Sequence, residues 1–162
     1  MIDQLPLLLL DVDGVLCPLG DRGCEPLIDY GVAGESYLRY SVHTAARLRR
    51  LQESFRLVWA TSWEEEANEV IAPLFDLPPL PVIVFNDDAS EGESWKMPAI
   101  RDYVGDSPFA YVDDDIGADA FDWAAARSVP TLLLAIRGDR GLLAADVDEL
   151  EHFAREVAVS KA

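Results

Sequence analysis

The sequence predicts an α/β fold in which a five-stranded parallel sheet is covered by helices on both faces, as a three-layer sandwich. Two observations support this prediction. Five short apolar segments recur along the chain, and segments with a helical pattern separate most of them. The chain has 162 residues, which suffices for one domain with a substantial core, so we expect a single domain over residues 1–162.

Each expected strand is a short run of mainly apolar residues. The first, Leu5–Leu10, contains four consecutive leucines. Such a run has no amphipathic period and indicates a strand that is buried on both faces. The other expected strands are Phe55–Ala60, Pro81–Phe85, Phe109–Val112 and Thr131–Ile136.

The expected helices show apolar residues at helical spacing. In His43–Ser54, Ala45, Leu48 and Leu51 form one apolar stripe. The segment Glu64–Leu74 opens on three glutamates, which are favourable at a helix N-terminus because the helix dipole is positive there. The remaining expected helices are Trp95–Val104, Ala118–Ser128 and Ala144–Val159.

The segment from Leu16 to Ser41 does not follow the alternation of strands and helices. It separates the first strand from its helix and contains four glycines, two prolines, two cysteines and three tyrosines. A connection of this length in a compact domain is usually functional. We therefore predict a flap, or minimal cap, over residues 16–41. An inert surface excursion is the alternative.

The negative charge of the chain disfavours some classes of binding partner. With 13 basic and 30 acidic residues the formal charge is −17, and such a field repels nucleic-acid backbones and anionic lipid. This argues against nucleic acid without excluding it. No segment reaches the roughly 18 consecutive apolar residues of a membrane span, so we expect no membrane partner.

The cysteines and the first residues of the chain favour a cytoplasmic protein. Cys17 and Cys24 are the two cysteines, which are too few for a zinc site, and a reduced cytoplasmic protein is the simpler interpretation. A disulfide between them stays open. The first four residues, Met1 to Gln4, lack the positive start of a signal peptide.

Polar residues gather where the expected strands end. Asp11 and Asp13 follow the first strand, two residues apart, and therefore point the same way in an extended chain. Thr61 follows the second strand, Lys96 opens the helix before the fourth, and three aspartates, 113–115, follow the fourth. Because the carboxyl ends of parallel strands lie along one edge of the sheet, these residues should converge.

Such a cluster suits phosphoryl transfer. Carboxylates without histidine or cysteine favour a hard cation such as Mg²⁺, and a carboxylate can also act as a nucleophile. A second carboxyl can serve as acid and base, while a hydroxyl and a lysine hold phosphoryl oxygens. Each residue alone has a plainer explanation: Thr61 as a helix cap, Lys96 as a solvated lysine, the three aspartates as an acidic turn. Their joint order along the chain favours the functional interpretation.

These residues resemble the four motifs of the haloacid dehalogenase-like (HAD) superfamily of phosphotransferases. The matching positions cover nearly the whole chain and are Asp11-Val12-Asp13-Gly14-Val15, Thr61, Lys96 and Asp113-Asp114. Four further stretches are similar to a small bacterial branch that includes the phosphatase-like domains of some RNA-repair proteins. They are Trp59–Trp63, Tyr111–Asp115, Trp123-Ala124 and Pro130–Leu133. The resemblance implies a Rossmann-like catalytic domain.

The resemblance also implies a role for each catalytic residue. Asp11 would be the nucleophile and a metal ligand. Asp13 would be the general acid and base, with its backbone carbonyl on the metal. Thr61 would hydrogen-bond the transferring phosphoryl group, and Lys96 would pair with Asp11 and the phosphate.

The resemblance implies that Asp114, helped by Asp113, completes a Mg²⁺ site. Which of the aspartates at 113–115 binds the metal directly stays open. Four ionised carboxylates would place a charge of about −4 beside a phosphate, so a divalent cation, Lys96 and a protonated Asp13 are all needed.

The sequence therefore predicts a Mg²⁺-dependent phosphatase that acts through an aspartyl-phosphate. Its expected partner is a phosphorylated substrate, by default a small molecule. Two alternatives remain: a phospho-receiver signalling module, and a non-catalytic binding domain on the same fold. A receiver is a poorer fit, because its phosphorylated aspartate follows the third strand, where this chain has Phe85-Asn86-Asp87.

Overall fold

The computed structural model describes residues 5–31 and 37–160. Its central sheet has four parallel strands in the order β4-β1-β5-β6. The strands are β1 (Leu7–Leu10), β4 (Arg56–Trp59), β5 (Phe109–Asp113) and β6 (Thr131–Ala135). The expected α/β fold with a parallel sheet is confirmed, although the sheet has four strands and not five.

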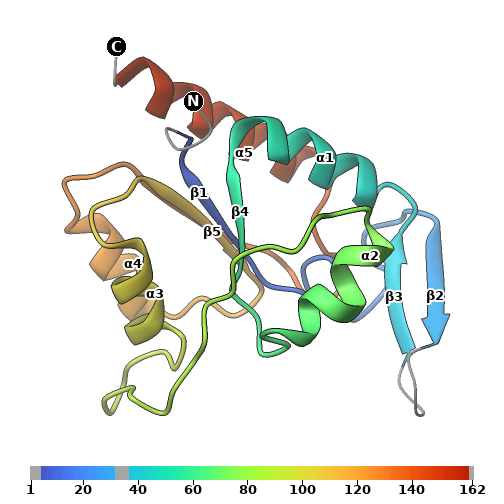
Figure 1. Ribbon diagram of the computed structural model, residues 1–162, viewed down its shortest axis with the longest axis horizontal. Coiled ribbons are helices and arrows are strands. Elements are labelled where there is room, and N and C mark those ends of the chain that lie inside the picture. Colours follow the sequence, from blue (N-terminus) through green and yellow to red (C-terminus); the bar gives the residue numbers. More distant parts are fainter. Residues whose placement is uncertain (1–4, 32–36, 161–162) are drawn as a thin grey trace.

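Helices cover both faces of the sheet, as predicted. The described residues form five α-helices: α1 (Thr44–Ser54), α2 (Ala72–Leu74), α3 (Met97–Val104), α4 (Ala118–Ala125) and α5 (Ala144–Ser160). Figure 1 shows α1 and α5 together on one side and α3 and α4 on the other.

The leucine run of β1 connects the two cores. All four of its side chains are buried. Because side chains alternate along a strand, Leu8 and Leu10 pack in the core that includes residues of α1 and α5, whereas Leu7 and Leu9 pack with residues of α3 and α4. β1 lies between β4 and β5, so Asp11 and Asp13 emerge at the centre of the sheet's carboxyl edge.

The fifth expected strand, Pro81–Phe85, is reduced to a single parallel bridge between Trp59 and Val82. Trp59 N–H donates to the Pro81 carbonyl at 2.8 Å, and Ile83 N–H donates to the Trp59 carbonyl at 2.9 Å. Pro81 has no N–H to extend the ladder, and Phe85 N–H donates to the Glu64 carboxylate instead. The prediction of a fifth strand was wrong for these reasons.

The expected helix Glu64–Leu74 is also shorter than predicted. Residues 62–65 form turns, followed by the π-helix η2 (Ala67–Ile71) and then α2. Glu64 has a φ of +46°, and a residue in the left-handed region cannot belong to a right-handed helix. Its carboxylate, which was expected to stabilise the helix start, accepts the Phe85 N–H.

The segment over residues 16–41 contains a β-hairpin. Its antiparallel strands are β2 (Leu27–Gly31) and β3 (Tyr37–Ser41), which lie to one side of the parallel sheet in Figure 1; residues 32–36 of the predicted flap fall outside the described residues. Arg47 of α1 fixes the base of the hairpin, donating to Glu25 at 2.8 Å and to the Leu142 carbonyl at 3.0 Å. The role of this segment as a flap over the site stays a prediction.

The two cysteines do not form a disulfide, which the sequence left open. Cys17 is buried and Cys24 is exposed, and both are free thiols, so no disulfide joins them. Burial raises the pKa of the Cys17 thiol to about 12, which leaves it protonated and unreactive.

Within the described residues, no helix combines the length and the apolar character needed to cross a bilayer.

Candidate active site

A tight turn after β1 positions the first two aspartates. The Val12 carbonyl accepts the N–H groups of Val15, Leu16 and Cys17, and Gly14 N–H donates to the Cys17 carbonyl at 2.8 Å. Gly14 has a φ of +76°, and a Cβ at this position would collide with the Asp114 carboxylate. Glycine is thus required both by the backbone conformation and by the close approach of Asp114.

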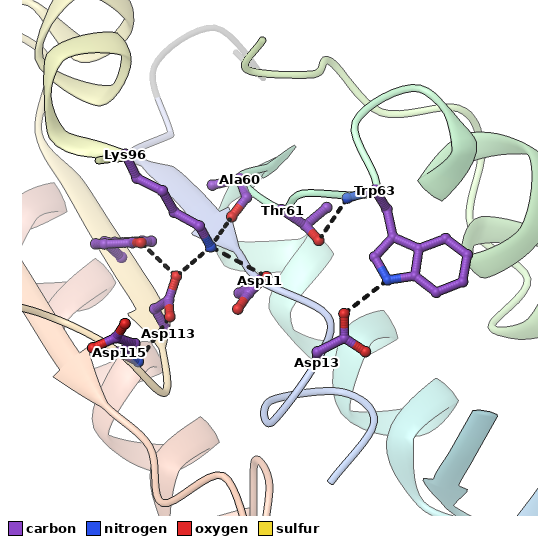
Figure 2. A network of polar contacts seen from close by, with 9 residues as sticks. Asp11, Asp13, Ala60, Thr61, Trp63, Lys96, Asp113 and Asp115 are labelled. Atoms are coloured by element: carbon purple, nitrogen blue, oxygen red, sulfur yellow. Dashed lines mark hydrogen bonds and ion pairs between the residues drawn. The ribbon is translucent and has the colours of Figure 1, made fainter. Parts of the chain in front are cut away.

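Lys96 lies at the centre of the site with its side chain almost fully buried. Its Nζ lies 2.7 Å from Asp113 Oδ2, 3.3 Å from Asp11 Oδ1 and 3.1 Å from the Ala60 carbonyl oxygen. Figure 2 shows Asp11, Ala60 and Asp113 converging on the end of the Lys96 side chain. The ammonium group therefore bridges two carboxylates that would otherwise repel each other.

Asp113 is held on both oxygens. Oδ2 accepts the Tyr111 hydroxyl as well as Lys96, and Oδ1 accepts the Asp115 backbone N–H at 2.9 Å. Burial, together with the charge of Asp113, raises the pKa of Tyr111 far above its ordinary value. The phenol therefore keeps its proton and donates a hydrogen bond to Asp113. The Asp113 carboxylate is consequently fixed in one orientation.

Asp11, Asp113 and Asp114 form a group that could hold a metal ion. One carboxylate oxygen from each lies within 4.8 Å of the others. Burial, with a smaller contribution from Asp113, raises the pKa of Asp11 to about 7 although Lys96 opposes the shift. Burial and then Asp113 also raise the pKa of Asp114.

An oxygen-only donor set of this kind suits a hard divalent cation. Three carboxylates face a single lysine, so the group carries excess negative charge that a cation would neutralise. The Asp115 carboxylate is not a member of the group among the described residues. The geometry therefore favours Asp113 and Asp114 over Asp115.

Thr61 is fully buried at the end of β4. Its hydroxyl oxygen accepts the Trp63 backbone N–H at 3.3 Å, and its carbonyl accepts the Glu64 N–H at 3.0 Å. Thr61 thus stabilises the turn that replaces the expected helix start. Among the described residues, the Thr61 hydroxyl donates no hydrogen bond. Its hydrogen is therefore available to a substrate oxygen.

The Asp13 carboxylate lies apart from the three-acid group. It is half-buried, and its Oδ2 accepts the Trp63 indole N–H at 2.9 Å. Figure 2 shows Asp13 directed toward Trp63 and away from Lys96. Metal binding through the Asp13 backbone carbonyl stays a prediction.

Sequence reasoning missed two contacts of the site. The Trp63 indole hydrogen-bonds Asp13, and the Tyr111 hydroxyl holds Asp113. Tyr111 stands two residues before Asp113, so the alternation of the strand directs both side chains to one face. This spacing could have indicated the contact between Tyr111 and Asp113. No sequence pattern indicates the contact between Trp63 and Asp13, which are 50 residues apart and are brought together only by the tertiary structure.

A comparison with protein families identifies the group to which this geometry belongs. Residues 7–147 match the family described as the HAD domain in Swiss Army Knife RNA repair proteins. The chain belongs to this family. The resemblance to the haloacid dehalogenase-like superfamily is thereby confirmed, and the matched range contains all four motifs. No curated protein matches the chain.

Membership of the HAD family gives the cluster a chemical context. HAD domains are mostly hydrolases, phosphatases among them, and they typically use a metal ion. The chain therefore combines a hydrolase family with an acidic group able to hold a metal.

Proposed function

We propose that this HAD domain is a Mg²⁺-dependent phosphomonoesterase that acts through an aspartyl-phosphate at Asp11. The observation that carries the proposal is the position of Lys96, which contacts Asp11 and Asp113 beside Asp114. A lysine buried among acids at the carboxyl edge of a sheet matches what a phosphoryl group needs: positive charge next to a carboxylate nucleophile.

The first half of the reaction forms the intermediate. A carboxylate oxygen of Asp11 attacks the phosphorus, and the bond from phosphorus to the ester oxygen breaks. Asp13 gives its proton to that oxygen, so the alcohol leaves neutral. The Trp63 indole can only donate, and it already donates to Asp13 Oδ2. Oδ1 accepts no hydrogen bond from the described residues and is available to carry the proton that is transferred.

The second half releases the product. The Asp13 carboxylate takes a proton from water, whose oxygen attacks the phosphorus of the aspartyl-phosphate. The bond from phosphorus to Asp11 breaks, which regenerates both aspartates and frees inorganic phosphate. Each turnover thus consumes one water and returns Asp13 to its protonated form.

Electrostatic stabilisation of the transferring phosphoryl group would come from side chains of the site. Lys96 and the Thr61 hydroxyl would hold phosphoryl oxygens as charge develops on them. Asp11, Asp113 and Asp114, with the Asp13 carbonyl, would hold Mg²⁺. When bound, the cation supplies the positive charge that lets an anionic ester approach these acids.

Two substrate classes are candidates. A phosphorylated small molecule is the default, because a chain with a formal charge of −17 repels long polyanions. The family description names RNA repair proteins, which supports a phosphorylated RNA end as the second candidate.

The test is phosphate release from a panel of phosphomonoesters, with Mg²⁺ and with a chelator. We expect turnover with Mg²⁺, loss of turnover in the chelator and loss in Asp11→Asn, which removes the nucleophile while keeping its shape. Asp122→Asn, an exposed acid on α4, is the matched control and should retain activity.

Other outcomes would contradict the proposal. Full turnover without metal, or turnover by Asp11→Asn, would remove the cation or the nucleophile from the mechanism. Stable phosphorylation without release of phosphate would favour a phospho-receiver module. Binding of phosphorylated compounds without either reaction would favour a non-catalytic domain.

A further inference from the structure

A groove of about 490 Å³ lies between the turn after β1 and the hairpin. Of the described residues, seven line it: Asp13, Cys17, Pro18, Leu19, Asp29, Leu38 and Arg39. It therefore begins at the proposed acid of the active site and ends at the paired strands β2 and β3.

The groove lies on the side of the site where a leaving group would be. This step rests on the proposed function: Asp13 can protonate the ester oxygen only if the alcohol part of the substrate lies next to it. Because Asp13 also lines the groove, the alcohol part would extend along the groove toward the hairpin.

The lining of the groove has an apolar part and a charged end. Pro18, Leu19 and Leu38 offer apolar surface, and Leu19 is 71% exposed. Among the described residues that line the groove, Arg39 alone is cationic. An occupant with both an apolar surface and an anionic group would match this lining.

Arg39 is oriented for such a group. Asp29, its direct partner across the hairpin, accepts from Nε at 2.6 Å and from Nη2 at 3.3 Å. A guanidinium group has five N–H donors, so three remain, and they find no acceptor in the part of the chain that the structure describes. The planar fork is thus held along one edge and open along the other.

We propose that Arg39 binds a second anionic group on the alcohol part of the substrate. The substrate class is then a phosphomonoester whose leaving group carries apolar surface and another phosphate or carboxylate. A small bisphosphate and the phosphorylated end of a nucleic acid share this chemistry. The formal charge of −17 favours the small molecule, since it disfavours a long polyanion more than a compact one.

The test uses pairs of substrates that differ by one anion, assayed with Mg²⁺. Phenyl phosphate is compared with 4-carboxyphenyl phosphate, and adenosine 3′-phosphate with adenosine 3′,5′-bisphosphate. The wild-type protein should have a lower KM for the member with the extra anion. Arg39→Gln should raise that KM about tenfold and leave kcat and the other KM unchanged.

Asp29→Asn separates recognition from hairpin stability. It removes the ion pair but keeps the Arg39 guanidinium, so the preference for the extra anion should persist. If Arg39 only stabilised the hairpin, both substitutions would act alike and on both members of each pair. That result, or a wild-type protein without preference, would overturn the inference.

A binding measurement keeps this result distinct from the proposed catalytic activity. 4-Hydroxybenzoate, the alcohol that 4-carboxyphenyl phosphate would release, should bind the wild-type protein more tightly than phenol by calorimetry, and Arg39→Gln should abolish the difference. If this difference in binding is observed but none of the phosphomonoesters is hydrolysed, the proposed phosphatase activity is refuted and the anion site is supported. Equal binding of the two compounds would refute the site.

A 3′-phosphorylated oligoribonucleotide distinguishes the two sources of the anion. A KM above that of the bisphosphate would support the small-molecule source. A lower KM that depends on Arg39 would keep the anion site and assign it to a nucleic-acid end.

Discussion

Two ion pairs in this molecule have almost the same length and opposite surroundings. Lys96 and Asp113 lie 2.7 Å apart with side chains 10% and 2% exposed, whereas Arg39 and Asp29 lie 2.6 Å apart with side chains 49% and 57% exposed. If a buried pair is broken, the remaining charge has no water to solvate it; an exposed charge returns to solvent. The surroundings, and not the distance, decide what each pair contributes.

This difference also matches the two functions that we propose. The buried pair fixes Lys96, the proposed phosphate-binding lysine, within a rigid network that includes Tyr111 and the Asp115 N–H. The exposed pair leaves a guanidinium available for an incoming anion at little cost to the fold. A single sheet edge and its neighbouring hairpin can thus hold both a preorganised centre and an adaptable recognition group.

The largest expected effect follows removal of the buried cation. Lys96→Met should lower the free energy of unfolding by about 3–5 kcal/mol, because it leaves Asp11 and Asp113 buried without their partner. It should also abolish phosphate release. Urea denaturation of the metal-free protein gives the first quantity, and the Mg²⁺-dependent assay gives the second.

The matched control is Arg101→Met, at a half-buried cation of the adjacent helix α3. It should have a much smaller effect on stability and none on phosphate release. A Lys96→Met protein as stable as the wild type would show that the acids of the site do not depend on this lysine.

A second prediction concerns pH. Because burial raises the pKa of Asp11 from 3.8 to about 7, the folded metal-free protein holds a proton there that the unfolded chain has released. Its free energy of unfolding should therefore fall as pH rises from about 4 to about 7, by at most about 1.4 kcal/mol per unit, and this contribution should be constant above that range.

Asp11→Asn isolates this contribution, since the variant lacks the titrating group. Urea denaturation in a chelator at several pH values between 5 and 8 should show the wild-type protein losing stability relative to the variant. A difference that does not change with pH would contradict the prediction.

The sequence was sufficient to predict the buried strand and the residues that gather at its carboxyl end, because both depend on local patterns. The leucine run predicted a strand that is buried on both faces, and Asp11, Lys96 and Asp113 converge because parallel strands end at one edge. The family followed from the same residues. The predicted catalytic roles await the experiments above.

The sequence was not sufficient where tertiary contacts override local preference. Glu64 was expected to open a helix, but its left-handed backbone and its bond to Phe85 N–H place it in a turn. The hairpin was described only as a flap, although the aromatic and β-branched residues of Leu27–Gly31 and Tyr37–Ser41 are typical of strands. Pairing across an insertion depends on register, which composition does not reveal.

The smallest expected effect completes the comparison. Arg39→Met should leave the free energy of unfolding without measurable change at physiological salt, because water replaces Asp29 around a half-exposed group. Arg47→Met, at the base of the same hairpin, should destabilise the protein clearly. Arg47 is buried, donates to Glu25 and to the Leu142 carbonyl, and holds the pKa of Glu25 at about 2. Urea denaturation of both variants decides the matter: if Arg39→Met were as damaging as Arg47→Met, the hairpin would need the Arg39 pair, and exposure would not explain its availability to a ligand.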